Sequence, residues 1–167
     1  STVRCVSITN TAITLEKRIP AGGGLGGGSS DAAVALLGLS ALWGLDYPVG
    51  RLAGIGASLG SDVPFFLFGG TARGLGRGER IVPLPALPPA GTVLVMPPFP
   101  VATPAVFGRL DAPSWDGLPG EEADAARVPD RNDLEPAAEA LFPALGEVRE
   151  ALASAGAVQA RLSGSGS

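Results

Sequence analysis

The sequence contains no histidine, one cysteine, one lysine and eleven arginines among its 167 residues. Without histidine, this chain cannot form Ser-His-Asp or Cys-His nucleophiles or zinc sites built from histidine. Because Cys5 is the only cysteine, no internal disulfide can form, and we expect a reducing compartment, the cytoplasm. The net charge of −4 and the scattered basic residues argue against a nucleic-acid partner.

Long hydrophobic runs are also missing. The longest apolar stretch, residues 32–45, is too interrupted to span a bilayer and no signal peptide precedes it, so we expect no membrane partner. Hydrophobic residues nevertheless make up 46% of the chain, which allows a buried core in one moderate domain or two small ones. The last residues, Ser163–Ser167, resemble the beginning of a loop without its continuation, so we expect an incomplete chain.

Glycine is abundant, with 25 residues, and six of them fall within residues 22–28. This run lies between a strand-like segment and a helix-forming segment. Because glycine has no side chain, the backbone N–H groups of the run are accessible to a ligand, and they point in the same direction as the positive end of the helix dipole. This arrangement is typical of a phosphate-binding loop. The residues expected to bind nucleotide phosphates are Pro20, Ala21, Gly22, Gly23, Gly24, Leu25, Gly26, Gly27, Gly28, Ser29 and Ser30.

Other interpretations of the glycine run stay open. A glycine-rich run can be a flexible linker, and Ser30 can be a helix cap without a ligand. A Walker P-loop is excluded, because Gly28 is followed by Ser29 and not by lysine. A dinucleotide fingerprint matches within the run, with Asp46 nearly twenty residues later, and it predicts a nicotinamide oxidoreductase. The charged segment before the run does not fit the apolar parallel strand that this fingerprint requires.

Hydrophobic periodicity indicates a mixed α+β chain without βαβ repeats. We expect strands at residues 11–19, 92–96 and 158–162, a hairpin of residues 65–72 and 79–84, and a loop over 111–131. We expect helices from the glycine run to about residue 44, over 49–59, and from Asp133 to a stop at Gly156. Ser29 and Ser30 are suitable N-caps for the first helix, and Asp31 adds a favourable charge to its first turn.

The segment Pro20–Ala33 resembles the second motif of the GHMP kinases, a family of small-molecule kinases. Three further segments resemble that family in the expected order: Gly60–Phe66, Asn132–Glu135 and Arg161–Ser167. The doubled glycine triplet followed by Ser-Ser-Asp-Ala-Ala is most similar to the members that phosphorylate 4-diphosphocytidyl-2-C-methyl-D-erythritol.

The resemblance implies an α+β GHMP kinase fold. Residues 1–85 would form an N-terminal ATP-binding part like domain 2 of ribosomal protein S5, lacking its start, and residues 86–167 a ferredoxin-like C-terminal part, lacking its end. The implied reaction is transfer of the γ-phosphoryl group of ATP, with Mg²⁺, to the 2-hydroxyl of that small-molecule substrate in non-mevalonate isoprenoid synthesis. The alternatives are another member, of homoserine or mevalonate type, and an inactive nucleotide-binding fragment.

The resemblance also assigns roles to single residues. Asp62 would be the base that accepts the proton of the attacking hydroxyl, and an ordinary turn aspartate is the alternative. Thr103 would lie on the substrate or phosphate side, or it would cap the helix that follows. The same side would include Ser163, Gly164, Ser165 and Gly166, for which a simple turn is the alternative. No metal ligand is assigned firmly, although Ser29 or Ser30 could bind Mg²⁺.

One part of the family pattern has no counterpart in this sequence. The family carries a catalytic lysine in an early motif, together with aromatic and histidine residues that hold a cytosine base, and nothing in residues 1–12 matches. Lys17 precedes the glycine run and is not assigned the role of that lysine. Asp31 is interpreted as an ordinary first-turn aspartate.

Overall fold

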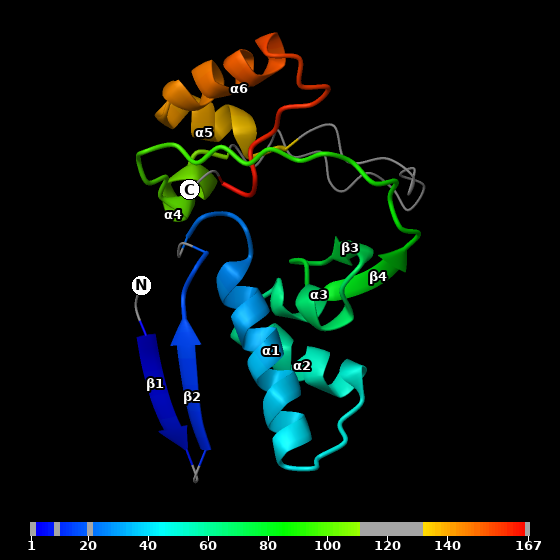
Figure 1. The fold of residues 1–167 in the computed structure, drawn as a ribbon. Coiled ribbons are helices and arrows are strands. Elements are labelled where there is room, and N and C mark those ends of the chain that lie inside the picture. The colour runs from blue at the N-terminus through cyan, green and yellow to red at the C-terminus, as the bar shows by residue number, and fades with distance from the viewer. Residues whose placement is uncertain (1–2, 9–10, 20–21, 111–131, 166–167) are drawn as a thin grey trace. The chain divides into compact units, whose positions relative to one another are not determined.

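The computed structural model describes residues 3–8, 11–19, 22–110 and 132–165. The predicted loop over 111–131 and the predicted site residues Pro20, Ala21 and Gly166 lie outside these ranges. Figure 1 shows the elements in their order: β1 Val3–Ile8, β2 Thr11–Glu16, α1 Gly27–Leu42, α2 Val49–Leu59, α3 Val63–Phe68, β3 Thr71–Leu75, β4 Arg80–Leu84, α4 Thr103–Phe107, α5 Glu135–Leu141 and α6 Ala144–Ser154. Within the described ranges, none of the helices has the length and apolar character that a membrane span needs.

The chain divides into two compact units. The first comprises Ser1–Ala21 and Gly26–Ala86, and the second comprises Gly22–Leu25 and Leu87–Ser167. The glycine run is therefore shared: its first half belongs to the second unit, and its second half, which opens α1, belongs to the first.

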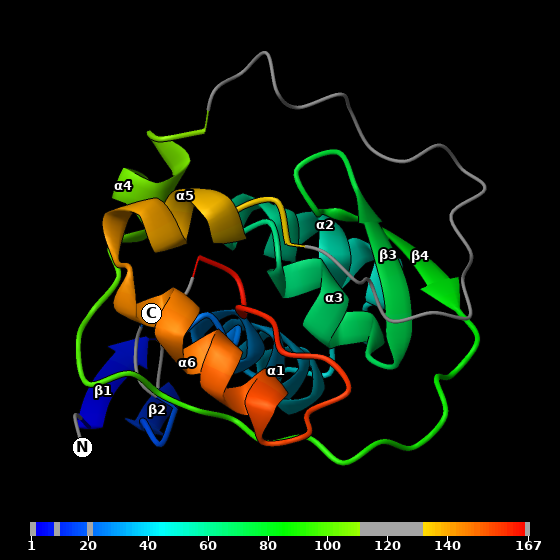
Figure 2. The same ribbon diagram turned by 90° about the horizontal axis from the view of Figure 1, so that it is seen from above.

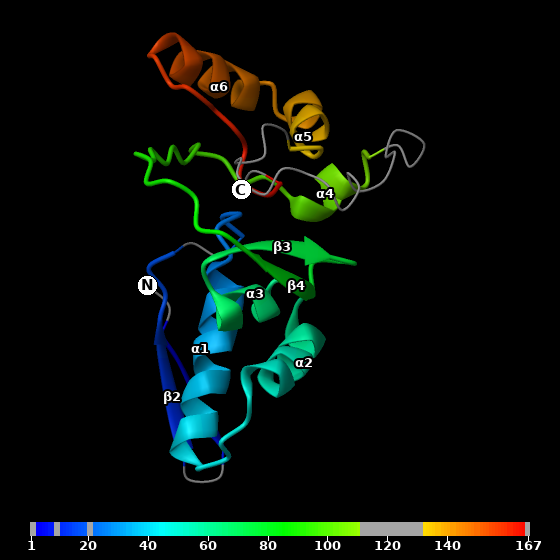
Figure 3. The ribbon, with the colours of Figure 1, turned by 90° about the vertical axis from the view of Figure 1, so that its right-hand side faces the viewer.

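An antiparallel hairpin opens the first unit. Val3 of β1 pairs with Glu16 of β2, and Ile8 pairs with Thr11. The hairpin lies beside α1 in Figures 1 and 3, and Nε1 of Trp43 donates a hydrogen bond to Oγ1 of Thr11 at 3.3 Å. The strand predicted over 11–19 is confirmed as far as Glu16, where the pairing with β1 ends.

Helices α1, α2 and α3 contact one another and build the core of the first unit. Its buried residues come from all three helices: Ala33, Leu52, Val63 and Leu67. Gly56 permits the close approach of α2 to α3, because a methyl group there would lie 2.8 Å from Cγ1 of Val63. The predicted helices ending near residue 44 and over 49–59 are confirmed.

The prediction of a strand over residues 65–72 is wrong at its start. Residues Val63–Phe68 form the helix α3, and only Thr71–Leu75 forms a strand, which pairs with β4 near α3 (Figure 2). Pro64 lies in the first turn, where its fixed φ favours a helix, and Gly69 follows the last turn with φ 68°. A short apolar run does not by itself distinguish a strand from a buried helix. The predicted hairpin is confirmed at residues 71–84.

The second unit has a core of its own. It is formed by the buried residues Val101, Val106, Ala137, Ala138 and Leu145. The rings of Phe99 and Phe142 stack against each other with centroids 6.0 Å apart. The helical pattern predicted from Asp133 is divided into α5 and α6, with Pro143 as the N-cap of α6, and it stops near Gly156, whose φ is 97°.

Two strands predicted for the second unit are wrong. Residues 92–96 and 158–162 pair with no strand among the described residues. Val93 is 79% exposed, and Val158 is fully exposed. A strand requires a neighbour that satisfies its backbone groups, and an apolar pattern does not reveal whether one is present.

Candidate active site

Helix α1 begins inside the glycine run. Its N-cap is Gly26, with a left-handed φ of 65°, and its first hydrogen bond runs from N of Ser30 to O of Gly26 at 2.8 Å. By helix geometry, the N–H groups of Gly27, Gly28 and Ser29 have no acceptor within the helix. These donors and the positive end of the dipole form a site that suits a phosphate group.

The prediction that Ser29 or Ser30 caps α1 is wrong. The helix has no side-chain cap, and Oγ of Ser30 donates to O of Gly27 at 2.9 Å. Gly26 takes the N-cap position because glycine adopts a left-handed φ without strain, and a side chain there would overlap the ring of Phe66. Because the helix starts at Gly27, Asp31 lies beyond its first turn, contrary to the prediction.

A lysine–aspartate pair lies beside the start of α1. Nζ of Lys17 forms an ion pair with Oδ2 of Asp31, and the two side chains are 24% and 33% exposed. A methyl group on Gly27 would lie 3.6 Å from the same Nζ. A positive charge therefore stands next to the first turn of α1, with Asp31 balancing it. Sequence reasoning missed this pair, because no local pattern links residues on either side of a loop.

Asp62 is the N-cap residue of α3, and its exposed side chain makes no hydrogen bond that caps the helix. Its Oδ1 accepts a hydrogen bond from Oγ of Ser61 at 3.5 Å. The β3–β4 turn is close, since a Cβ on Gly78 would lie 3.7 Å from Oδ1. One turn further along α3, the ring of Phe66 lies against Gly26. Helix α3 therefore links Asp62 to the N-terminus of α1 within the first unit.

In the second unit, the first half of the glycine run contacts the C-terminal Ser-Gly segment. Oγ of Ser163 donates a hydrogen bond to O of Gly24 at 2.9 Å. Gly24 has φ 64°, and a side chain there would overlap the carbonyl group of Ser163. A Cβ on Gly164 would lie 3.4 Å from Cα of Gly24. The close approach therefore requires glycine at position 24, and the left-handed φ of 60° favours glycine at position 164.

Thr103 and Ser165 are also brought together. Their hydroxyl oxygens are 2.6 Å apart, and Ser165 is buried. Thr103 is the first residue of α4 and Ala102 is its N-cap, so the interpretation of Thr103 as a helix cap is wrong. Asn132 binds the same Ser-Gly segment through Leu162 and Gly164. Sequence reasoning treated Asn132 only as part of a helix start and missed this contact.

The dinucleotide interpretation lacks its structural context. The strand β2, which precedes the glycine run, is antiparallel to β1, and the part of the chain that the structure describes contains no parallel strand pair. A Rossmann fingerprint requires a parallel strand directly before the glycines.

Mg²⁺ needs few protein ligands in a nucleotide site, because it keeps several waters and binds phosphate oxygens. The described ranges contain no group of three or more Cys, Asp or Glu side chains that could hold a metal ion. The hydroxyl of Ser29 at the start of α1 is an oxygen ligand of the kind that Mg²⁺ accepts, so the residues present fit Mg²⁺ only as a partner of a bound nucleotide.

Two family models match the chain, GHMP kinases N terminal domain over residues 2–70 and GHMP kinases C terminal over residues 117–167. Curated relatives named 4-diphosphocytidyl-2-C-methyl-D-erythritol kinase include those of Geobacter metallireducens, 44% identical over 95% of this chain, and Paramagnetospirillum magneticum, 46% identical over 93%. A crystal structure of 4-(cytidine 5'-diphospho)-2C-methyl-D-erythritol kinase is 43% identical over 91% of this chain, with a TM-score of 0.75.

The chain spans only part of these relatives. It covers 58% and 57% of the two curated proteins and 57% of the crystallised chain. The structural match confirms the predicted α+β fold of the GHMP kinases. Because the N-terminal and C-terminal models match in order and together cover most of the sequence, the chain belongs to the GHMP kinase family.

Proposed function

We propose that the full-length protein transfers the γ-phosphoryl group of ATP to the 2-hydroxyl of 4-diphosphocytidyl-2-C-methyl-D-erythritol, a small-molecule substrate of isoprenoid precursor synthesis. The observation that carries this proposal is the 42–46% identity, over most of this chain, to relatives named for that kinase activity. The site geometry supports it, because phosphoryl transfer depends on positioning and on charge stabilisation, and the start of α1 offers both to a phosphate.

In this proposal, residues 20–30 hold the ATP phosphates. The N–H groups at the start of α1 bind phosphate oxygens, and the ammonium group of Lys17, paired with Asp31, lies beside them. Ser29 or Ser30 would supply a hydroxyl to Mg²⁺, and the ion would neutralise charge on the phosphates when bound with ATP. The geometry that supports this assignment is the left-handed N-cap at Gly26, which leaves the first-turn amides without a side-chain hydrogen-bond cap.

Asp62 acts as the base in this proposal. Its carboxylate is exposed and does not cap α3, so it can meet the acceptor hydroxyl.

The substrate or phosphate side of the site is bound by Thr103 and residues 163–166. The contacts of Thr103 with Ser165 and of Ser163 with Gly24 support this assignment. In the same proposal, residues 1–85 belong to the N-terminal ATP-binding part of the GHMP kinase fold and residues 86–167 to its C-terminal part. The protein acts in the cytoplasm.

A coupled ADP-release assay on the full-length protein tests this function. The acceptors are 4-diphosphocytidyl-2-C-methyl-D-erythritol, homoserine and mevalonate, and ATP without an acceptor is the control. We expect Mg²⁺-dependent ADP release with the first acceptor. Turnover of homoserine or mevalonate alone would assign the chain to another member of the family. Binding of an ATP analogue without ADP release from any acceptor would indicate an inactive nucleotide-binding protein.

A further inference from the structure

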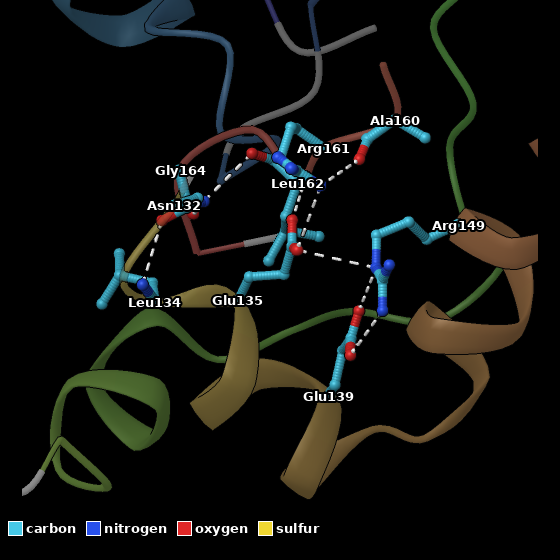
Figure 4. Close-up of polar contacts among 9 residues, drawn as sticks. All are labelled: Asn132, Leu134, Glu135, Glu139, Arg149, Ala160, Arg161, Leu162 and Gly164. Carbon is cyan, nitrogen blue, oxygen red and sulfur yellow. Dashed lines mark hydrogen bonds and ion pairs between the residues drawn. The ribbon is translucent and has the colours of Figure 1, made fainter. Parts of the chain in front are cut away.

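Asn132 connects the start of α5 to the C-terminal Ser-Gly segment. Its Nδ2 donates hydrogen bonds to O of Leu162 at 3.0 Å and to O of Gly164 at 2.7 Å, and its Oδ1 accepts one from N of Leu134 at 3.0 Å (Figure 4). Both donor hydrogens and the acceptor of the side-chain amide are therefore used. One side chain sets the distance between the helix start and the two carbonyls on either side of Ser163.

Glu135 holds the same segment from its N–H side. Its Oε2 accepts a hydrogen bond from N of Leu162 at 3.0 Å, and its side chain is only 14% exposed. The peptide groups of Leu162 are thus bound on both sides, by Glu135 at N and by Asn132 at O (Figure 4). The side chain of Leu162 packs against the core of the second unit.

Two arginines balance the charge of Glu135. Nε of Arg149 lies 3.5 Å from Oε1 of Glu135, and Nη1 of Arg161 lies 3.8 Å from the same oxygen. Arg149 also forms two hydrogen bonds with Glu139, at 2.7 Å and 3.2 Å, which raise the pKa of Arg149. Because both oxygens of Glu135 have partners, its carboxylate is kept turned toward Leu162.

Asn132 and Glu135 bind the segment of residues 162–164, and the serines at positions 163 and 165 make two of the contacts in the candidate site. Ser163 binds Gly24 of the glycine run, and Ser165 binds Thr103. Among the described residues no strand pairs with this segment, so the side chain of Glu135 in α5 and that of Asn132, three residues before the helix, replace a strand ladder. Where Ser163 and Ser165 lie relative to Gly24 and Thr103 therefore depends on Asn132 and Glu135.

We propose that Asn132 is a positioning residue for phosphoryl transfer, acting through the turn at residues 163–165, with Glu135 as the second support of that turn. This inference rests on the function proposed above, because it assumes that the turn contributes to the kinase site. Small displacements of groups that position reactants lower the rate of the chemical step, even where no contact with the reacting atoms is lost.

Asn132→Asp in the full-length protein tests the proposal. The substitution keeps the shape of the side chain but places a carboxylate oxygen opposite two carbonyl oxygens, which repel it. We expect kcat to fall about 10- to 100-fold per folded molecule, while the Kd of an ATP analogue changes less than about threefold. Glu139→Gln is the matched control, because it breaks a pairing with Arg149 in the same cluster. We expect Glu139→Gln to lower Tm and to leave kcat unchanged.

A double-mutant cycle with Thr103→Val separates positioning from a general loss of structure. If Asn132 acts through the contact of Ser165 with Thr103, the loss of kcat caused by Asn132→Asp shrinks at least about fivefold in the Thr103→Val background. Wild-type kcat in folded Asn132→Asp, or independent losses in the cycle, would overturn the proposal.

Asn132→Ala removes the same hydrogen bonds without adding a charge. This variant is assayed in place of Asn132→Asp if Asn132→Asp does not fold. A folded Asn132→Ala protein with wild-type kcat overturns the proposal, and so does failure of both variants to fold, which indicates a purely structural role. Absence of ATP-dependent turnover in the wild-type protein overturns the proposed function itself and this inference with it. Failure of the inference alone leaves wild-type turnover intact.

Discussion

At the scale of single residues, the glycines of the run differ in what surrounds them. Gly26 has φ 65°, and the ring of Phe66 fills the space that a side chain would need. Gly28 lies within α1, and a Cβ there would meet nothing within 4 Å. A substitution at Gly26 therefore disturbs the fold and the site together, whereas Gly28 allows the site to be tested alone.

We expect Gly28→Ala to weaken binding of an ATP analogue about tenfold or more without lowering stability. Alanine in a helix is favoured over glycine by up to about 1 kcal/mol, but its methyl group would stand where a phosphate approaches the backbone. Calorimetric titration and thermal unfolding measure the two effects. Gly38→Ala, also in α1 and in open space, is the control with unchanged binding. Unchanged affinity of Gly28→Ala would count against a phosphate site at α1.

We expect Asp62→Asn to lower kcat by about 10²- to 10⁴-fold, the contribution of a general base, while the KM for ATP stays within about threefold. Stability should change by less than about 0.5 kcal/mol, because the carboxylate is exposed and makes no cap. Asp46→Asn is the matched control, since Asp46 is exposed and has φ 47°, which asparagine also adopts. Equal losses of kcat and of ATP affinity would assign Asp62 a structural role instead.

At the scale of elements, the β3–β4 turn depends on a carboxylate. Oε2 of Glu79 accepts a hydrogen bond from N of Arg77 at 2.8 Å. Hydrogen bonds from its own backbone N–H and from that of Arg77 lower the pKa of Glu79 below the ordinary value of 4.5. A group whose pKa is lower in the folded state stabilises the fold above its unfolded pKa, and this contribution is lost as the pH falls through the folded pKa.

We therefore expect Glu79→Gln to lower Tm at pH 7, and the difference from the wild type to close as the pH falls below the ordinary carboxyl range. Thermal unfolding from pH 7 to pH 3 measures this difference. Exchange of the Arg77 amide gives a local check, because this amide loses its charged acceptor in the variant. A difference in Tm that stays the same at every pH would contradict the role of the charge.

At the scale of the whole molecule, the residues that the structure describes form one core in each of the two units. Leu52 is 3% exposed in the core of the first unit, and Leu145 is 5% exposed in the core of the second. Each core is formed by residues of its own unit.

We expect Leu52→Ala and Leu145→Ala each to destabilise the protein by about 2–5 kcal/mol, the usual cost of a cavity in a packed core. Hydrogen exchange should show the loss of protection chiefly in α1–α3 for Leu52→Ala and in α4–α6 for Leu145→Ala, since local opening follows cooperative units. Equal loss of protection in both units for either variant would show that the two cores unfold as one.

Sequence patterns that extend over only a few residues predict the helices and turns that contain them well. Helical spacing and a glycine stop predict α2, and the glycine run predicts the start of α1 to within a few residues. The hairpin turn at residues 74–78 follows from its glycines. Residues 92–96 and 158–162 fail as strands because their apolar character says nothing about whether a partner strand lies beside them.

The order of residues along the chain determines the glycine loop, the amphipathic helices and the family motifs, because their signals lie within one or two turns of backbone. Only the tertiary structure decides that Lys17 pairs with Asp31, that Ser163 binds Gly24 and that Asn132 holds Leu162 and Gly164. These contacts join residues far apart in sequence. They depend on the path of the chain and on packing, which local propensity does not specify.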